Sequence, residues 1–236
     1  LQLKNGKTLL FLHIPKCAGV MIRRQFKALA MTNSLMFNSF WGINNDVDMA
    51  HIPLPYVLHY KPDLTTNHAK YGELVPFSVI RNPYDRIWSG YQFEKTANWI
   101  PQNPLYEDKS LDFNGFVQQH LPNILHDQQQ RMEENRDLYL GGIHFVKIST
   151  MLHHDEGMPD ALKIKEENIL NQEYICDEFA DFMLRCGAFS NDDEFERFRQ
   201  GLKPENCSNL AHPPKAYAYC KYYDAESIQV LNTLYD

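Results

Sequence analysis

The sequence has no long apolar segment. None of its hydrophobic runs approaches the ~18 residues that a membrane-spanning helix needs, and no basic stretch followed by an apolar one opens the chain. Hydrophobic residues nevertheless make up 44% of the 236 residues, and charged residues 22%. This composition is typical of a globular chain that is long enough to form one sizeable core.

Positive charge is also scarce. The chain has 23 lysines and arginines against 30 aspartates and glutamates, which gives a net charge of −7. Proteins that bind nucleic acids are usually basic because they neutralise phosphates. The charge therefore argues against a nucleic-acid polymer as the partner, and it disfavours a polyanionic substrate unless a basic cleft forms locally.

Cysteines are few, and their spacing matches no metal-binding pattern. There are five of them, an odd number: Cys17, Cys176, Cys186, Cys207 and Cys220. The run His153–Glu156 places potential ligands side by side, but adjacent residues rarely converge on one ion. We therefore interpret this run as a solvated loop and expect no metal ion.

Short apolar runs, two of them followed by helical segments, predict the fold class. The runs at Thr8–Ile14, Leu74–Ile80 and Ile143–Ile148 are typical of strands buried on both faces, as in a parallel sheet. Helices are expected over Val20–Met31 and from Asn82 to about Thr96. We therefore expect a three-layer α/β fold with a mainly parallel central sheet flanked by helices.

The first strand ends in a corner that suits an anion. The residues His13–Lys16 lead to the small residues Ala18 and Gly19, after which a helix is expected. A strand that turns sharply into a helix directs backbone N–H groups toward one spot, where the helix dipole adds partial positive charge. Lys16 would add a full charge, so the corner suits a phosphate or a sulfate.

This corner does not match the Walker A sequence, G-x-x-x-x-G-K-[ST], in which the hydroxyl after the lysine binds Mg²⁺. Here Lys16 precedes Gly19, and Cys17 follows the lysine. No Mg²⁺ ligand is evident, which argues against a kinase that uses a metal-bound nucleoside triphosphate. An ordinary strand–helix turn with a surface lysine explains this stretch alone equally well.

A second corner follows the next apolar strand. Arg81 ends the strand, and Asn82-Pro83 marks a helix start, because Asn is a good N-cap and Pro is favoured at the first helical position. Ser89 follows in that helix. Arg81 offers a planar fork for a phosphate and Ser89 a hydroxyl, although Arg81 could equally form a structural ion pair with Asp85. Two such corners at strand ends would suit a nucleotide with phosphates at both its 5′ and 3′ positions.

Together the two stretches resemble the sulfotransferases that use 3′-phosphoadenosine 5′-phosphosulfate (PAPS). The branch that they resemble contains the heparan sulfate 2-O- and 6-O-sulfotransferases and their bacterial relatives. "HIPK" followed by small residues resembles the family's 5′-phosphosulfate loop, and "RNPYDR" followed by Ser and an aromatic residue resembles its 3′-phosphate site. Weaker similarities at Lys163–Ile169 and Ala216–Asp236 extend the resemblance over nearly the whole chain.

The resemblance implies a P-loop-like fold in a single domain, residues 1–236, and transfer of a sulfuryl group from PAPS to a hydroxyl without a metal. By position it implies that the 5′-phosphosulfate binds to the loop residues Pro15, Lys16, Cys17, Ala18, Gly19 and Val20. Lys16 would stabilise the charge that develops on the leaving group. Arg81 and Ser89 would hold the 3′-phosphate.

The loop departs from the family pattern, which usually reads similarly to "KTGGTS". Cys17, Val20 and Met21 stand where the family has hydroxyl side chains that touch the 5′-phosphate. Backbone N–H groups and Lys16 would therefore have to hold the phosphosulfate alone. This departure motivates a second hypothesis, a nucleotide-binding module of the same fold with impaired catalysis.

The reaction also needs a base that accepts the proton of the acceptor hydroxyl. A neutral histidine can do so near pH 7, because its unperturbed pKa is about 6.5. We predict His51, which lies between the two donor motifs, where the branch often has a catalytic histidine. His59 is the second candidate, and His13, beside the loop, is expected to be structural.

The resemblance also bears on acceptor and compartment. It implies a carbohydrate acceptor, with a tyrosine side chain or a small alcohol as the alternatives. The low positive charge argues against long, highly sulfated chains. The absence of basic charge, of evident cysteine pairs and of an anchor favours a cytoplasmic enzyme, with the Golgi lumen as the alternative if this is the catalytic domain of an anchored protein.

Overall fold

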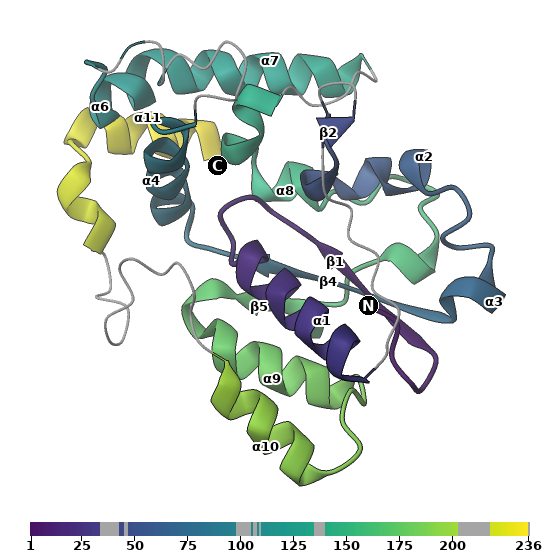
Figure 1. Cartoon of the computed structure of the whole chain (residues 1–236). Coiled ribbons are helices and arrows are strands. Elements are labelled where there is room, and N and C mark those ends of the chain that lie inside the picture. Colours follow the sequence, from purple (N-terminus) through teal and green to yellow (C-terminus); the bar gives the residue numbers. More distant parts are fainter. Residues whose placement is uncertain are drawn as a thin grey trace. The chain divides into compact units, whose positions relative to one another are not determined.

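The structure, a computed structural model (Figure 1), describes residues 1–33, 43–44, 47–97, 105, 108, 110–134, 140–202 and 218–235. These residues form two compact units. The first unit comprises the described residues within Leu1–Phe40, Ala50–Ile80 and Ile148–Ala211. The second comprises those within Trp41–Met49, Arg81–Lys147 and His212–Asp236.

The first unit contains the parallel sheet and the helices that cover it. Its helices and strands are β1 (Lys7–Leu12), α1 (Gly19–Asn33), α2 (Val57–Tyr60), α3 (His68–Tyr71), β4 (Glu73–Ile80), α8 (Ile148–Met151), β5 (Ile169–Asn171), α9 (Ile175–Arg185) and α10 (Asp192–Gly201). Short 3-10 helices lie at Leu54–Tyr56, Asp160–Leu162, Glu166–Asn168 and Gln172–Tyr174, and another, Met49–His51, spans the unit boundary.

The described sheet has the strand order β1-β4-β5, and both pairings are parallel. Ser78 in the central strand is in register with Leu12 of β1 and with Ile169 of β5. Its buried hydroxyl donates to the carbonyl of Leu12 at 2.7 Å. The predictions of strands at Thr8–Ile14 and Leu74–Ile80, and of a helix over Val20–Met31, are confirmed within a few residues.

One face of the sheet carries aromatic side chains. Phe11 and Phe77 are opposite each other in register, with ring centroids 5.0 Å apart. Phe26 of α1 meets Phe77 at 5.9 Å, and Phe182 of α9 meets it at 4.5 Å. Helices α1 and α9 therefore form the layer that covers this face (Figure 1).

The opposite face of the sheet carries aliphatic side chains, because successive residues of a strand point to opposite sides. Leu10 and Leu12 lie in a buried cluster with Leu54, Val57 and Leu162. These partners come from α2 and from short 3-10 helices. The unit therefore has layers on both faces of a parallel sheet, and the predicted three-layer α/β class is confirmed.

The second unit is mainly helical. Its elements are β2 (Ile43–Asn44), β3 (Val47–Asp48), α4 (Pro83–Glu94), α6 (Phe113–Gly115), a π-helical turn (Phe116–His120), α7 (Leu121–Glu133), 3-10 helices at Leu140–Phe145 and Ala218–Tyr222, and α11 (Ala225–Tyr235). The π-helical turn joins α6 to α7 without a break. Apolar side chains of α4, α6, α7 and α11 form its core, including Ile87, Phe113, Leu121 and Leu231.

The third predicted strand, Ile143–Ile148, is wrong. Leu140–Phe145 is a 3-10 helix, and Ile148 begins α8. The guanidinium of the fully buried Arg86 donates to the carbonyls of residues 144, 145 and 146. These carbonyls are therefore not available for a strand ladder. The third described strand of the sheet is instead β5, Ile169–Asn171.

Among the residues that the structure describes, no helix is both long enough and apolar enough to span a bilayer. The longest described helix, α1, has charged residues at Arg23, Arg24 and Lys27.

Candidate active site

The loop between β1 and α1 has an unusual backbone. Lys16 and Ala18 have positive φ angles, 66° and 56°, in the left-handed region that residues with a Cβ rarely enter. Such conformations cost about 1–3 kcal/mol each and often occur at binding sites, where the surrounding structure imposes them. Cys17, between them, is fully buried, and its amide donates to the carbonyl of Ile14 at 3.3 Å. The buried Cys17 thus anchors a strained loop.

The start of α1 directs backbone amides to the same corner. The first intrahelical bond runs from the amide of Ile22 to the carbonyl of Ala18, at 3.2 Å. The amides of Gly19, Val20 and Met21 precede that bond, at the positive end of the helix dipole. Pro15 is buried and Lys16 half-buried beside this turn. The corner therefore has the features that bind anions at helix N-termini.

The side chains that replace the three family hydroxyls are not equivalent. Cys17 and Met21 are buried in the core, with exposed fractions of 0% and 2%. Val20 is 38% exposed. Val20 is therefore the one position of the three whose side chain reaches solvent, and the one where a hydroxyl could reach a ligand.

The predicted base lies close to this corner. His51 ends the 3-10 helix Met49–His51 and is half-buried, and its ring centroid is 4.3 Å from that of His13. His13 is 8% exposed and is the first residue after β1. His59, the second candidate, is exposed in α2 with its ring against Tyr60. His51 therefore contacts His13, and His13 lies beside the loop.

At the second corner the polar groups come mainly from side chains, whereas at the first they come mainly from the backbone. Asn82 caps α4, because its side chain accepts from the amides of Tyr84 (3.0 Å) and Asp85 (3.5 Å). The Nε of Arg81 donates to Oδ2 of Asp85 at 2.6 Å, and Nη2 contacts the same oxygen. The ion pair that the sequence left open is thus present. Ser89 lies half-buried further along α4.

Sequence reasoning missed a buried polar stripe on α4. Arg86, Gly90 and Glu94 are four residues apart and buried, so they share one side of the helix. Arg86 bonds the carbonyls of residues 144–146, and a Cβ on Gly90 would lie 2.8 Å from the Phe145 ring. Glu94 Oε1 contacts Nδ1 of His144 at 2.8 Å. The stripe fixes residues 144–146 on α4.

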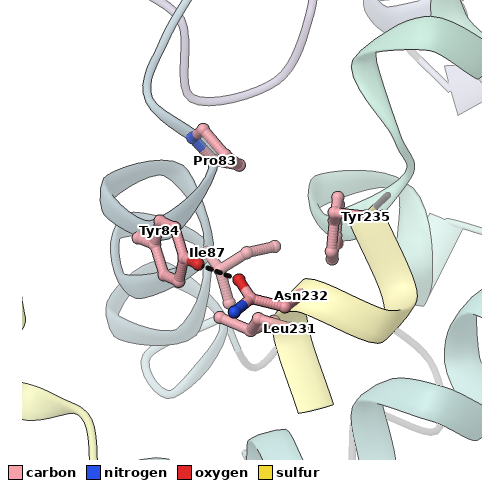
Figure 2. Close-up of a pocket in the computed structure, with 6 residues that line it drawn as sticks. All are labelled: Pro83, Tyr84, Ile87, Leu231, Asn232 and Tyr235. Atoms are coloured by element: carbon pink, nitrogen blue, oxygen red, sulfur yellow. Dashed lines mark hydrogen bonds between the residues drawn. The ribbon is translucent and has the colours of Figure 1, made fainter. Parts of the chain in front are cut away.

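A pocket lies on another side of α4 (Figure 2). It is lined by Pro83, Tyr84, Ile87, Leu231, Asn232 and Tyr235 and holds about 380 Å³ of space that is partly open to solvent. The Tyr84 hydroxyl donates to Oδ1 of Asn232 across it. Tyr84 and Ser89 are about 140° apart around the helix, since each residue turns it by about 100°. The pocket is therefore separate from the side that carries Ser89.

The described residues contain no cluster of three or more His, Cys, Asp or Glu side chains that could hold a metal ion. The features of the first corner are a lysine, strained backbone and helix amides. Such groups act on an anion by position and by charge.

A comparison with known families assigns the chain to one of them. A sequence profile described as "Sulfotransferase family" matches residues 3–236, nearly the whole chain. The chain belongs to the sulfotransferase family. The α/β fold of this sulfotransferase, with a parallel sheet flanked by helices, is consistent with that assignment. Comparisons with curated proteins and with solved structures gave no match. As a member of this family, the sulfotransferase is a transferase of sulfuryl groups.

Proposed function

We propose that this sulfotransferase uses PAPS as its donor and that the loop Pro15–Val20 binds the 5′-phosphosulfate. The observation that carries the proposal is the strained backbone at Lys16 and Ala18, next to the amides that open α1. Strain of this kind is retained where function needs it. The loop offers an oxyanion one full positive charge, from Lys16, and the first amides of α1.

Arg81 and Ser89 are proposed to hold the 3′-phosphate of the same donor. The guanidinium of Arg81 already pairs with Asp85, and its side chain is 14% exposed. An incoming phosphate would therefore share the guanidinium fork with Asp85 or take its place. A phosphate should compete well with the single carboxylate, because it carries up to two negative charges and can accept two parallel bonds from the guanidinium fork.

In the proposed reaction the acceptor oxygen attacks the sulfur in line with the leaving group. A bond forms between the acceptor oxygen and sulfur, while the bond from sulfur to the bridging oxygen of PAPS breaks. The hydroxyl proton passes to His51, and the electron pair of the broken bond leaves on 3′,5′-adenosine bisphosphate. Lys16 stabilises that negative charge, so positioning and electrostatics supply most of the catalysis, as in phosphoryl transfer.

A carbohydrate hydroxyl is the proposed acceptor. Its support is the resemblance of "HIPK" and "RNPYDR" to the heparan sulfate 2-O- and 6-O-sulfotransferase branch. The net charge of −7 favours an acceptor with few sulfates over a long polyanion. A tyrosine side chain or a small alcohol would need the same base and the same donor.

Calorimetric titration with 3′,5′-adenosine bisphosphate tests the donor assignment, with 5′-AMP and ATP–Mg²⁺ as comparisons. We expect the bisphosphate to bind more tightly than AMP and Arg81→Ala to abolish that difference. Arg131→Ala is the matched control, because Arg131 lies on α7 in an exposed pair with Asp127. Tighter binding of ATP–Mg²⁺, or no binding of any nucleotide, would contradict the proposal.

Turnover separates an enzyme from a binding module of the same fold. If PAPS is consumed and His51→Ala stops its consumption without loss of bisphosphate binding, the protein is an enzyme with His51 as base. If the bisphosphate binds but PAPS is never consumed with any acceptor, the binding module is the correct description.

A further inference from the structure

The ring of His13 is held on two sides. Phe11 stacks on it with centroids 5.3 Å apart and an interplanar angle of 24°. On another side lies the backbone of Gly19, where a Cβ would be 1.7 Å from Nε2 of His13. Real Cβ atoms do not approach so closely, so only glycine at position 19 allows this placement. The orientation of the His13 ring is therefore fixed by β1 and by the start of α1.

His51 packs directly on this fixed ring. The two imidazole centroids are 4.3 Å apart with an angle of 42°, closer than about 4.5 Å, the lower end of the usual range for aromatic pairs. His51 is half-buried, whereas Leu54, three residues later, is buried in the aliphatic core. The chain after His51 is thus anchored, and the ring of His13 is an aromatic neighbour that limits how the His51 ring can turn.

We propose that His13 is a positioning residue that sets the orientation of His51. This inference rests on the proposed function, in which His51 accepts the proton of the acceptor hydroxyl. A base must reach that proton within hydrogen-bond distance, and a displacement of 1 Å can cost about 100-fold in rate. Three residues then act in series: Gly19 makes room for His13, and His13 orients His51.

The role of His13 is to present an aromatic surface, and the proton stays with His51. His13→Ala removes that surface. His13→Phe keeps an aromatic face but has no ring nitrogen, so it separates packing from proton chemistry. His68→Ala is the control, because His68 is exposed in α3 of the same unit.

The test combines turnover with a direct view of the His51 ring. Turnover is the release of sulfate from PAPS with water as the acceptor. The ring is followed by the NMR signals of its carbon-bound protons, assigned by their loss in His51→Gln. Calorimetry with 3′,5′-adenosine bisphosphate reports on the donor site in every variant.

We expect His13→Ala to lower kcat by about 10- to 100-fold while the KM for PAPS and the Kd of the bisphosphate stay within about twofold. The His51 ring signals should move in the same variant. His13→Phe should recover most of kcat, and His68→Ala should change nothing. A general loss of stability would instead lower binding and turnover together.

Three results would overturn the inference. In the first, His13→Ala leaves kcat and the His51 signals unchanged. In the second, kcat falls equally in a folded His13→Phe, which would give His13 a chemical role. In the third, the wild-type protein shows no nuclear Overhauser effect between the two rings, a measurement that does not depend on His13→Ala or His13→Phe folding.

The failure of the proposed function has a separate signature. If His51→Ala turns over PAPS as fast as wild type, His51 is not the base, and the catalytic part of the inference falls with it. If His51→Ala is inactive while His13→Ala is fully active, the base stands and only the positioning role is wrong.

Discussion

The corner after β1 and the corner after β4 offer positive charge to an anion in different ways. At the first, strained backbone at Lys16 and Ala18 precedes the opening amides of α1. At the second, Asn82 already caps α4, and the charge comes from the Arg81 side chain, which Asp85 holds. At the first corner the opening amides of α1 can bind an anion. At the second, the side chain of Asn82 already accepts from the opening amides of α4.

Under the proposed function, a strand that leads into a helix would serve two kinds of phosphate recognition. A backbone site has little freedom, since its donors move only if the loop moves. A side-chain site can exchange partners, because Arg81 can move from a carboxylate to a phosphate without change in the helix. Substitutions that displace the backbone of the first corner should therefore affect structure and binding together, whereas those at Arg81 should affect binding alone.

The largest expected effect comes from the stripe on α4 behind the second corner. Arg86→Leu would remove the donors to three backbone carbonyls from a fully buried position. We expect a loss of about 3–5 kcal/mol in the free energy of unfolding. Urea denaturation and Tm measure it. Arg131→Leu, which breaks an exposed pair, should cost at most about 0.5 kcal/mol, and equal losses in both variants would show that the buried bonds contribute nothing special.

An intermediate effect is expected at the first corner. Gly19→Ala would put a methyl group 1.7 Å from Nε2 of His13, so the imidazole must move. Overpacking of this kind costs about 1–3 kcal/mol, and bisphosphate affinity should fall with it. Ala18→Gly is the matched control with the opposite sign, since glycine accepts the φ of 56° without strain. A higher unfolding midpoint for Gly19→Ala than for Ala18→Gly would contradict this account of the loop.

The smallest expected effect is a gain. Val20→Ser restores a hydroxyl at the exposed position of the loop, where one hydrogen bond to a phosphate is worth about 1 kcal/mol, or about fivefold in affinity. The gain should be equal for 5′-AMP and for 3′,5′-adenosine bisphosphate, because the loop is proposed to bind the 5′-phosphate, which both ligands carry. Met31→Ser, at the other end of α1 and 75% exposed, should change neither. A gain confined to the bisphosphate would contradict the proposal, because it would show that the loop binds the 3′-phosphate.

The sequence was most informative where local signals and burial agree. The run Thr8–Ile14 is apolar and lies in a buried parallel strand, and Asn82-Pro83 begins a helix at the expected residue. The corner after β1 could be located in the same way, since it joins a buried strand to a helix. Its strained φ angles at Lys16 and Ala18 could not, because neither residue type favours that region.

Tertiary contacts explain the errors. Ile143–Ile148 has the β-branched and aromatic residues of a strand. The guanidinium of Arg86, however, donates hydrogen bonds to three of its carbonyls, which therefore cannot pair with a neighbouring strand. The spacing of Arg86, Gly90 and Glu94 was a usable signal that they share one side of the helix, yet arginine and glutamate side chains usually lie on a protein's surface. The strand β5 was missed because it has three residues, one of them polar. The contact of His51 with His13 joins distant residues, and no local pattern encodes it.

The strand order has a consequence for how the protein is made. The central strand β4 lies between β1, which is made before it, and β5, which is made after it and ends at Asn171. Because both pairings join segments distant in sequence, loops must close before those contacts form, and such topologies fold slowly. On the ribosome, the described sheet is complete only after residue 171 has emerged. Until then the nascent chain exposes apolar strands around Phe11 and Phe77, and this is the period in which chaperones would matter most.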